Sequence, residues 1–361
     1  MRTIILLMMF ILVILITLCT YMCVKNGYSV FRKNRLEKKD KVICFLISCF
    51  IVGIAFYFQV TGVVVLLHFL VSIMLYNFIF WVIKYKKEDF KLKYYKKYYF
   101  IPFLVTLMFI GYGFYNMTQI HEKHYVIESN KITDNQKIAF ISDIHYGYVQ
   151  DPQLLKDTVQ ELNKKSLDIV ILGGDLLDES STKENMQEVF EVLGQIKSQK
   201  GIYYVYGNHD LQTYSESPSY TQTDLEQALE DNHIILLKDE YVSLDDMILA
   251  GRENVQRDRK ETKEILTGIS QEQFVLLVDH QPVGVQDNSD AGVDLQISGH
   301  THAGQIIPVG LLNSLRGAYN YGHFEVDQTD LIVSSGLTGW GFPMRTQGYC
   351  EYVIVDIVST K

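Results

Sequence analysis

The distribution of apolar and polar positions divides the chain into two parts. The first part contains four long apolar segments, at residues 4–24, 42–58, 63–83 and 99–115. A helix needs about 20 mostly apolar residues to cross about 30 Å of hydrocarbon, so the first and third segments are ample and the other two are at the short end. The pattern therefore predicts an N-terminal four-helix transmembrane region over residues 1–117.

A cleaved signal peptide is the alternative interpretation of the first apolar segment. Its apolar stretch is longer than the usual core of a signal peptide, and no small-x-small cleavage site follows it. We therefore expect residues 4–24 to form a spanning helix.

Short apolar runs replace the long segments after residue 117. They predict strands at residues 125–128, 138–142, 169–172, 202–206, 234–237, 248–250, 274–278, 294–297, 331–334 and 352–357. Helix-like stretches at residues 152–165, 182–199, 223–231 and 257–266 alternate with the earlier strands. The later strands come without long helices between them. This mixture predicts a layered α/β sandwich over residues 118–361, with residues 118–124 as a connector to the membrane.

The two parts carry opposite net charges. Residues 1–117 contain 15 Lys and Arg against 4 Asp and Glu, whereas residues 118–361 contain 18 against 38. The cations of the first part gather in two loops, at residues 25–41 and 84–97. Positively charged loops tend to stay in the cytoplasm, so four spans would place the acidic part on the extracytoplasmic side. The same acidity argues against a nucleic-acid substrate, for which a basic face is expected.

Five polar blocks follow apolar runs in the acidic part. They are Asp143-Ile144-His145, Gly174-Asp175-Leu176-Leu177-Asp178, Gly207-Asn208-His209-Asp210, Asp279-His280-Gln281-Pro282 and Gly299-His300-Thr301-His302. Because each block comes directly after a predicted buried strand, we expect all five at one sheet edge.

The side chains of these blocks are the types that bind divalent metal ions. Asp175 follows two glycines, which allow a tight turn, and one carboxylate can bridge two ions about 3.5 to 4 Å apart. Nitrogen and oxygen ligands without a thiolate favour Mn²⁺, Fe²⁺ or Zn²⁺ over Ca²⁺. Each block alone also fits an ordinary turn, a helix cap or a structural histidine. The five together predict a site for two divalent metal ions.

With these five blocks in this order, the chain resembles the calcineurin-like metallophosphoesterases over about residues 124–357. The resemblance implies a four-layer fold in residues 118–361, a β-sandwich flanked by helices. It implies that one ion is held by Asp143, His145, Asp175 and His302, and the other by Asp175, Asn208, His280 and His300. It also implies that His209 contacts the scissile phosphate as the catalytic histidine and that Asp210 orients it.

The resemblance implies hydrolysis of a phosphate ester with a metal-activated hydroxide as nucleophile. The segment from Ser335 to Arg345 is similar to the membrane-associated bacterial branch of the family. We therefore predict a membrane-anchored enzyme of the cell envelope that hydrolyses a phosphodiester or pyrophosphate, lipid-linked or wall-linked. The alternatives are a phosphomonoesterase of the same fold and a catalytically silent metal-binding scaffold.

Three positions outside the blocks bear on the substrate. Arg345 is a candidate phosphate contact, because few basic residues follow Lys263. Arg252 stands after Gly251, where many relatives carry acidic residues, and it would favour an anionic substrate or decorate a turn. Trp340 would receive an acyl chain or a ring, or anchor its Gly-rich loop. The sequence makes no prediction of oligomeric state.

Overall fold

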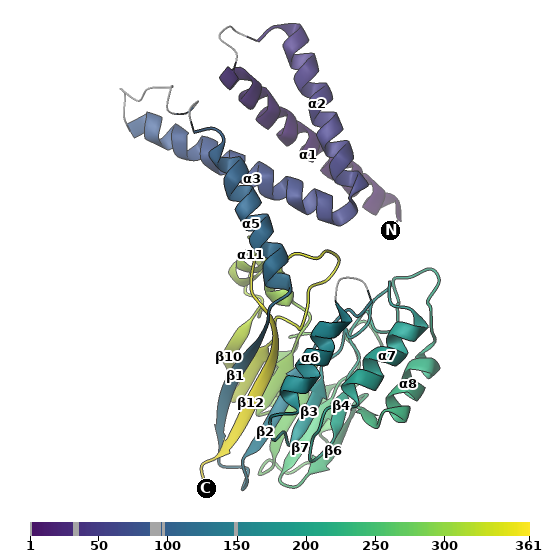
Figure 1. Ribbon diagram of the computed structural model, residues 1–361. Coiled ribbons are helices and arrows are strands. Elements are labelled where there is room, and N and C mark those ends of the chain that lie inside the picture. The colour runs from purple at the N-terminus through teal and green to yellow at the C-terminus, as the bar shows by residue number, and fades with distance from the viewer. Residues whose placement is uncertain (1, 32–35, 87–94, 96–97, 148–150) are drawn as a thin grey trace. The chain divides into compact units, whose positions relative to one another are not determined.

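The computed structural model describes every residue except 1, 32–35, 87–94, 96–97 and 148–150, and it divides into two compact units (Figure 1). Unit 1 is Met1–Tyr112 and unit 2 is Gly113–Lys361. The predicted division at residues 117 and 118 lies slightly later. The difference arises because the last turn of a helix packs inside unit 2, as described below.

Unit 1 is built from apolar helices. They are α1 (Arg2–Phe31), α2 (Lys38–Tyr57), α3 (Gln59–Lys86) and most of α5 (Ile101–Met117). Three of them, at Phe10–Val30, Lys38–Tyr57 and Gln59–Lys86, are long and apolar enough to cross a membrane. Helix α5 has 17 residues, which at 1.5 Å per residue is about 25 Å and falls short of about 30 Å of hydrocarbon. The predicted number of four such helices is therefore wrong, and the described residues hold three.

The helices of unit 1 have the exposure expected in lipid. Ile16, Val52 and Leu66 belong to one buried cluster between α1, α2 and α3. Large apolar side chains such as Phe50 and Met74 lie on the outside. Part of the two basic loops on which the topology prediction depends lies outside the described residues.

Unit 2 contains two six-stranded mixed sheets (Figure 1). The first has the order β1-β12-β2-β3-β4-β5, with bounds Ile120–Ser129, Cys350–Ser359, Gln136–Ile141, Ile169–Leu172, Ile202–Tyr204 and Ile234–Leu236. The second has the order β10-β11-β9-β8-β7-β6, with bounds Gly322–Val326, Thr329–Val333, Leu295–Ser298, Phe274–Val278, Met247–Gly251 and Glu240–Leu244. Strands β2 to β5 are parallel to one another, as are β7, β8, β9 and β11. The predicted layered α/β architecture is confirmed.

Strand β2 shows why these runs are apolar at every position. Ile138 and Phe140 belong to the cluster between the two sheets, whereas Ala139 and Ile141 belong to the cluster beneath the helices. Successive side chains of a strand point to opposite faces, and here both faces are buried.

Helices cover the outer face of each sheet. Helices α6 (Pro152–Leu162), α7 (Lys183–Leu193) and α8 (Gln222–Asp231) pack on the first sheet through one large apolar cluster (Figure 1). Helices α9 (Thr262–Ile265) and α10 (Val285–Asp290) lie at the second sheet. Asp151 is the N-cap of α6, and its side chain accepts a hydrogen bond from the Gln153 N–H. Thr182 and Thr221 form capping boxes at the N-termini of α7 and α8.

Several elements differ from those expected. Strand β1 begins at Ile120 and takes up most of the predicted connector, because it pairs in parallel with β12 along its whole length. The edge strands β6 and β10 and the short helices α10 and α11 (Val309–Leu315) were not predicted. The two edge strands lack a buried apolar run, since their side chains are exposed or half-buried.

Candidate metal centre

The five predicted blocks converge at the carboxyl ends of five parallel strands. Asp143 and His145 follow β2, Asp175 follows β3, and the Asn208 block follows β4. The blocks of His280 and His300 follow β8 and β9 of the second sheet. The prediction that all five blocks lie at the edge of one sheet is corrected: three follow strands of the first sheet and two follow strands of the second. The candidate ligands of the two sheets meet because the two sheets pack face to face.

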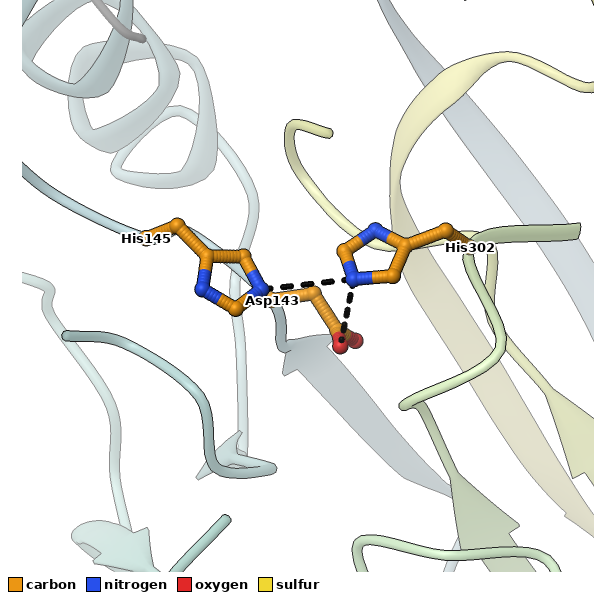
Figure 2. A group of neighbouring side chains, drawn as sticks. All are labelled: Asp143, His145 and His302. Atoms are coloured by element: carbon orange, nitrogen blue, oxygen red, sulfur yellow. Dashed lines mark hydrogen bonds and ion pairs between the residues drawn. The ribbon is translucent and has the colours of Figure 1, made fainter. Parts of the chain in front are cut away.

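One group of candidate ligands consists of Asp143, His145 and His302. One donor atom of each residue lies within 4.8 Å of the others. The Nε2 atoms of His145 and His302 are 3.3 Å apart, and His302 Nε2 is 3.5 Å from Asp143 Oδ1 (Figure 2). Asp143 and His145 are fully buried. Two ring nitrogens that face each other beside a carboxylate suit a shared cation.

A second group consists of Asp175, His280 and His300, again with donor atoms within 4.8 Å of one another. Asp175 Oδ2 lies 3.0 Å from His280 Nε2. His280 Nδ1 lies 2.8 Å from the Gly173 carbonyl oxygen, which can only accept, so this nitrogen carries the proton and Nε2 is the ligand atom. The contact thus fixes the tautomer that a metal ligand needs.

Asn208 occupies the loop between Gly207 and the catalytic candidate His209. It is buried, and its Oδ1 accepts from Gln281 Nε2 at 3.1 Å. Gln281 was not predicted to take part in the site. The predicted role of Asn208 as a ligand of the second ion stays a prediction.

The backbone at the candidate ligands is strained. Asp143, His145, Asp175, His300 and His302 all have φ between 48° and 70°. This left-handed region is uncommon for residues other than glycine, and such strain concentrates at functional sites. Gly207 lies so close that an added Cβ would be 2.1 Å from Asp175 Oδ1. The loops therefore hold these side chains in place at a cost in backbone energy.

The protonation of the two groups suits metal binding. Burial lowers the pKa of His145 and His302, and it lowers the pKa of His300 to about 4, so these imidazoles stay neutral. Burial opposes ionisation of Asp175, but His280 outweighs it and holds the pKa of Asp175 far below its usual value. Neutral imidazoles and ionised carboxylates are the forms that bind divalent ions. His280 is the exception: burial lowers its pKa, but Asp175 outweighs burial and raises that pKa to about 10, so an ion bound at this group would displace its Nε2 proton. The donor set therefore fits two such ions, one at each group.

His209 lies at the edge of these groups. Its ring centroid is 5.4 Å from that of His145 and 5.2 Å from those of both Trp340 and Tyr214. Its Nδ1 is 2.7 Å from Glu179 Oε2. Burial by itself lowers the pKa of His209, but the hydrogen bond to Glu179 and the nearby carboxylates raise it above the ordinary value. Glu179 was not predicted, although it directly follows the second block.

Asp210 does not hold the His209 ring. It is fully buried, and its two oxygens accept four backbone N–H groups at 2.6 to 3.1 Å. The donors are Asp175, Leu176, Leu177 and Gly207. The prediction that Asp210 orients His209 is corrected: Glu179 contacts the ring, and Asp210 joins the loops after β3 and β4.

The two candidate substrate arginines are both buried. Arg345 donates to the carbonyl oxygens of His302 at 3.0 Å, Ser335 at 2.9 Å and Thr338 at 2.6 Å. Arg252 donates to the Lys260 carbonyl at 2.9 Å and lies 3.6 Å from Asp279. Both guanidinium groups therefore contact protein atoms. Arg345 hydrogen-bonds the backbone of His302, a candidate metal ligand.

Replacing Glu179 by Gln is expected to shift the pH dependence of hydrolysis. If protonated His209 assists the leaving group, activity is lost as pH rises through the pKa of His209. Glu179 raises that pKa, so Glu179→Gln should move the alkaline limb of the kcat profile to lower pH. The profile is measured with both proteins at saturating substrate. An unchanged alkaline limb would show that Glu179 does not set the protonation of His209.

Comparison with known proteins now decides the family. Residues 136–304 match the family model described as Calcineurin-like phosphoesterase, and this range covers all five blocks. An "Uncharacterized metallophosphoesterase" of Helicobacter pylori (strain ATCC 700392 / 26695) is 32% identical over 254 residues. The chain belongs to the calcineurin-like phosphoesterase family.

The relatives differ in length and in what their names state. The Helicobacter pylori match covers 67% of this chain and 65% of the relative, which is just under two thirds of its length. A "Transmembrane protein with metallophosphoesterase domain" of Danio rerio is 27% identical, covering 72% of this chain and 62% of the relative. The "Uncharacterized metallophosphoesterase YkuE" of Bacillus subtilis (strain 168) is 27% identical, covering 70% and 91%. The transmembrane name of the Danio rerio relative agrees with the apolar helices of unit 1.

Proposed function

We propose that the chain is a membrane-anchored, two-metal phosphoesterase that hydrolyses a phosphodiester or pyrophosphate at the cell envelope. The observation that carries this proposal is the meeting of two buried ligand groups, with Asp143 in one and Asp175 in the other, beside His209. Membership of the family supports the reaction class. The apolar helices support a membrane-borne substrate, lipid-linked or wall-linked.

The proposed mechanism gives the ions, His209 and Asp210 separate roles in phosphoester hydrolysis. Two bound divalent ions would supply Lewis acidity and positive charge, which unit 2 with its excess of carboxylates lacks. In this proposal His209 gives a proton or hydrogen bond to the leaving oxygen through Nε2, while its Nδ1 contacts Glu179. The Asp210 carboxylate keeps the Asp175 and His209 loops together.

A phosphomonoesterase and a silent metal-binding scaffold are the alternatives. The scaffold would need the ligand groups but not a supported catalytic histidine. His209 has such support, because its Nδ1 lies 2.7 Å from Glu179 Oε2, and the aromatic residues beside it, Trp340 and Tyr214, are exposed to solvent. This arrangement favours an enzyme over a scaffold.

The decisive experiment uses the full-length chain in nanodiscs. Metal is removed with a chelator, Mn²⁺ is restored, and hydrolysis of bis-p-nitrophenyl phosphate is compared with that of p-nitrophenyl phosphate. Diester turnover that needs both Mn²⁺ and Asp175, tested with Asp175→Asn, is the expected result. Preference for the monoester would favour the phosphomonoesterase. No turnover by folded, metal-loaded protein would favour the scaffold.

We also propose that unit 2 faces the extracytoplasmic side. The basic loops at residues 25–41 and 84–97 favour the cytoplasm, and no charged residue occurs from Tyr98 to Ile120. This orientation requires α5 to cross as well, and its 17 residues reach only the lower end of the range of about 17–25 residues for a spanning helix, so the bilayer would have to thin around it. Reporter fusions after Gln119 are expected to be active outside the cytoplasm, and an active cytoplasmic reporter would contradict this orientation.

A further inference from the structure

Unit 2 carries an exposed apolar surface away from its two cores. It comprises the outward side chains of α11 and of Ile307, two residues before the helix, and is here called the α11 surface. Its members are Ile307, Val309, Leu311, Leu312 and Leu315, with exposed fractions from 38% to 75%. No charged residue occurs from Ile306 to Leu315, and Arg316 follows. Contiguous apolar patches of this kind mark sites of interaction with protein or membrane.

The packing of α11 fixes these side chains on the outside. Gly310 is the buried residue of the helix, and a Cβ at this position would lie 2.3 Å from both the Ala303 oxygen and Gln347 Nε2. The Gly310 N–H also donates to Gln347 Oε1 at 3.2 Å. The helix thus packs on unit 2 through its smallest residue and turns its leucines outward.

The same loop that holds α11 also holds the last turn of α5. Within unit 2, the Arg345 N–H donates to the Gly113 carbonyl at 3.0 Å. Asn116 Nδ2 donates to the carbonyls of Arg345 at 3.1 Å and Gly348 at 2.9 Å. One residue along from Arg345, Thr346 Oγ1 accepts from the Ile307 N–H at 3.1 Å. Residues 345–348 therefore join the α11 surface to the point where the chain leaves its apolar helices.

We propose that the α11 surface inserts into the interface of the lipid bilayer. Helix α5 is short, and its last turn, from Gly113 to Met117, is packed inside unit 2. Because the end of apolar helix α5 is hydrogen-bonded to residues 345–348, these residues would lie at the surface of the bilayer that contains the rest of α5. The apolar side chains tied to that loop then lie where acyl chains begin, with Arg316 available to anionic headgroups.

The location of this surface also bears on the metal centre. Gln305, which precedes α11, accepts from the Trp340 N–H at 2.9 Å and donates to the carbonyls of Trp340 and Phe342 at 3.2 Å. Trp340 lies against His209. A bilayer at the α11 surface would therefore lie beside one wall of the site. The insertion itself does not depend on which reaction the site performs.

Depth-dependent quenching tests the insertion in the full-length chain. The two native tryptophans are replaced, Trp81→Phe and Trp340→Phe, and one tryptophan is introduced at Leu311 or at Leu315. Matched controls carry it at Val126 or Ile235, which are exposed apolar positions on strands β1 and β5. The proteins are placed in nanodiscs with or without lipids brominated on their acyl chains, and circular dichroism checks folding.

Tryptophan at Leu311 or Leu315 is expected to lose about half of its fluorescence in brominated lipid, because an inserted apolar face lies about 5–10 Å into the headgroup and acyl boundary. The controls at Val126 and Ile235 should be unaffected. Equal, weak quenching at all four positions would overturn the proposal. A blue-shifted but unquenched tryptophan at Leu311 would also overturn it, since protein, either a second copy or a partner, would then cover the surface.

Discussion

Replacing His209 by Ala is expected to lower kcat for a phosphodiester by about 10²- to 10⁴-fold, the usual contribution of general acid catalysis. The contact of this residue with the Asp175 carboxylate is made by its backbone N–H, at 2.8 Å, and survives the substitution. Only the ring, which reaches Glu179, is lost. Metal content should therefore stay unchanged while turnover falls.

The measurement pairs steady-state kinetics with metal analysis of the purified full-length protein. His121→Ala is the matched control, because His121 is an exposed histidine of β1 in the same unit. Its kinetics should equal those of the unaltered chain. If His209→Ala kept its kcat with metal bound, His209 would not be the catalytic histidine. If it lost metal instead, its ring would be part of the metal centre.

Replacing Asp210 by Ala is expected to lower the free energy of unfolding of unit 2, so its effect should not be confined to catalysis. The substitution leaves four backbone N–H groups without their acceptor in a fully buried place. Each unsatisfied buried donor costs about 1–3 kcal/mol, so the loss of an acceptor for four donors should lower the free energy of unfolding by about 4 kcal/mol or more. Two of these donors, Asp175 and Gly207, belong to the loops of the metal centre, so metal affinity should fall as well.

Chemical denaturation of the full-length protein in detergent, followed by near-ultraviolet circular dichroism, measures this loss. Asp258→Ala is the control, because Asp258 is an exposed carboxylate. Asp210→Asn should lose less stability than Asp210→Ala, since it keeps one acceptor oxygen. A stable Asp210→Ala protein with intact metal binding and reduced kcat would restore the catalytic role that the sequence suggested.

Much of unit 2 could be predicted because its signals are local. The apolar runs that end before Asp143, Asp175 and His280 are strands buried on both faces, and burial on both faces requires apolar residues at every position. The elements that were missed have weaker signals. Strand β6 is an edge strand with exposed side chains, and α11 is a short helix whose apolar residues face outward.

The partners of the site residues could not be predicted in the same way. The sequence suggests that Arg345 is a cation available to phosphate. In the structure it is fully buried and donates hydrogen bonds to three carbonyl oxygens. Asp210 ends the third block and Glu179 directly follows the second, and only the path of the loops shows that Glu179 is the carboxylate that contacts the His209 ring. A hydrogen bond depends on distances of a few tenths of an ångström, and spacing along the chain does not specify these.

The pattern of residues was enough to predict an apolar helical region, the strands of the core, the order of the ligand blocks and the family that they indicate. These depend on which side chains are apolar and which can bind a metal, and both properties belong to the residues. The tertiary structure decided that α5 is shorter than a full span, that Glu179 supports His209, that Asp210 and Arg345 brace backbone, and that the leucines of α11 face outward. Each of these depends on which distant segments meet in the folded chain, and only packing in three dimensions determines that.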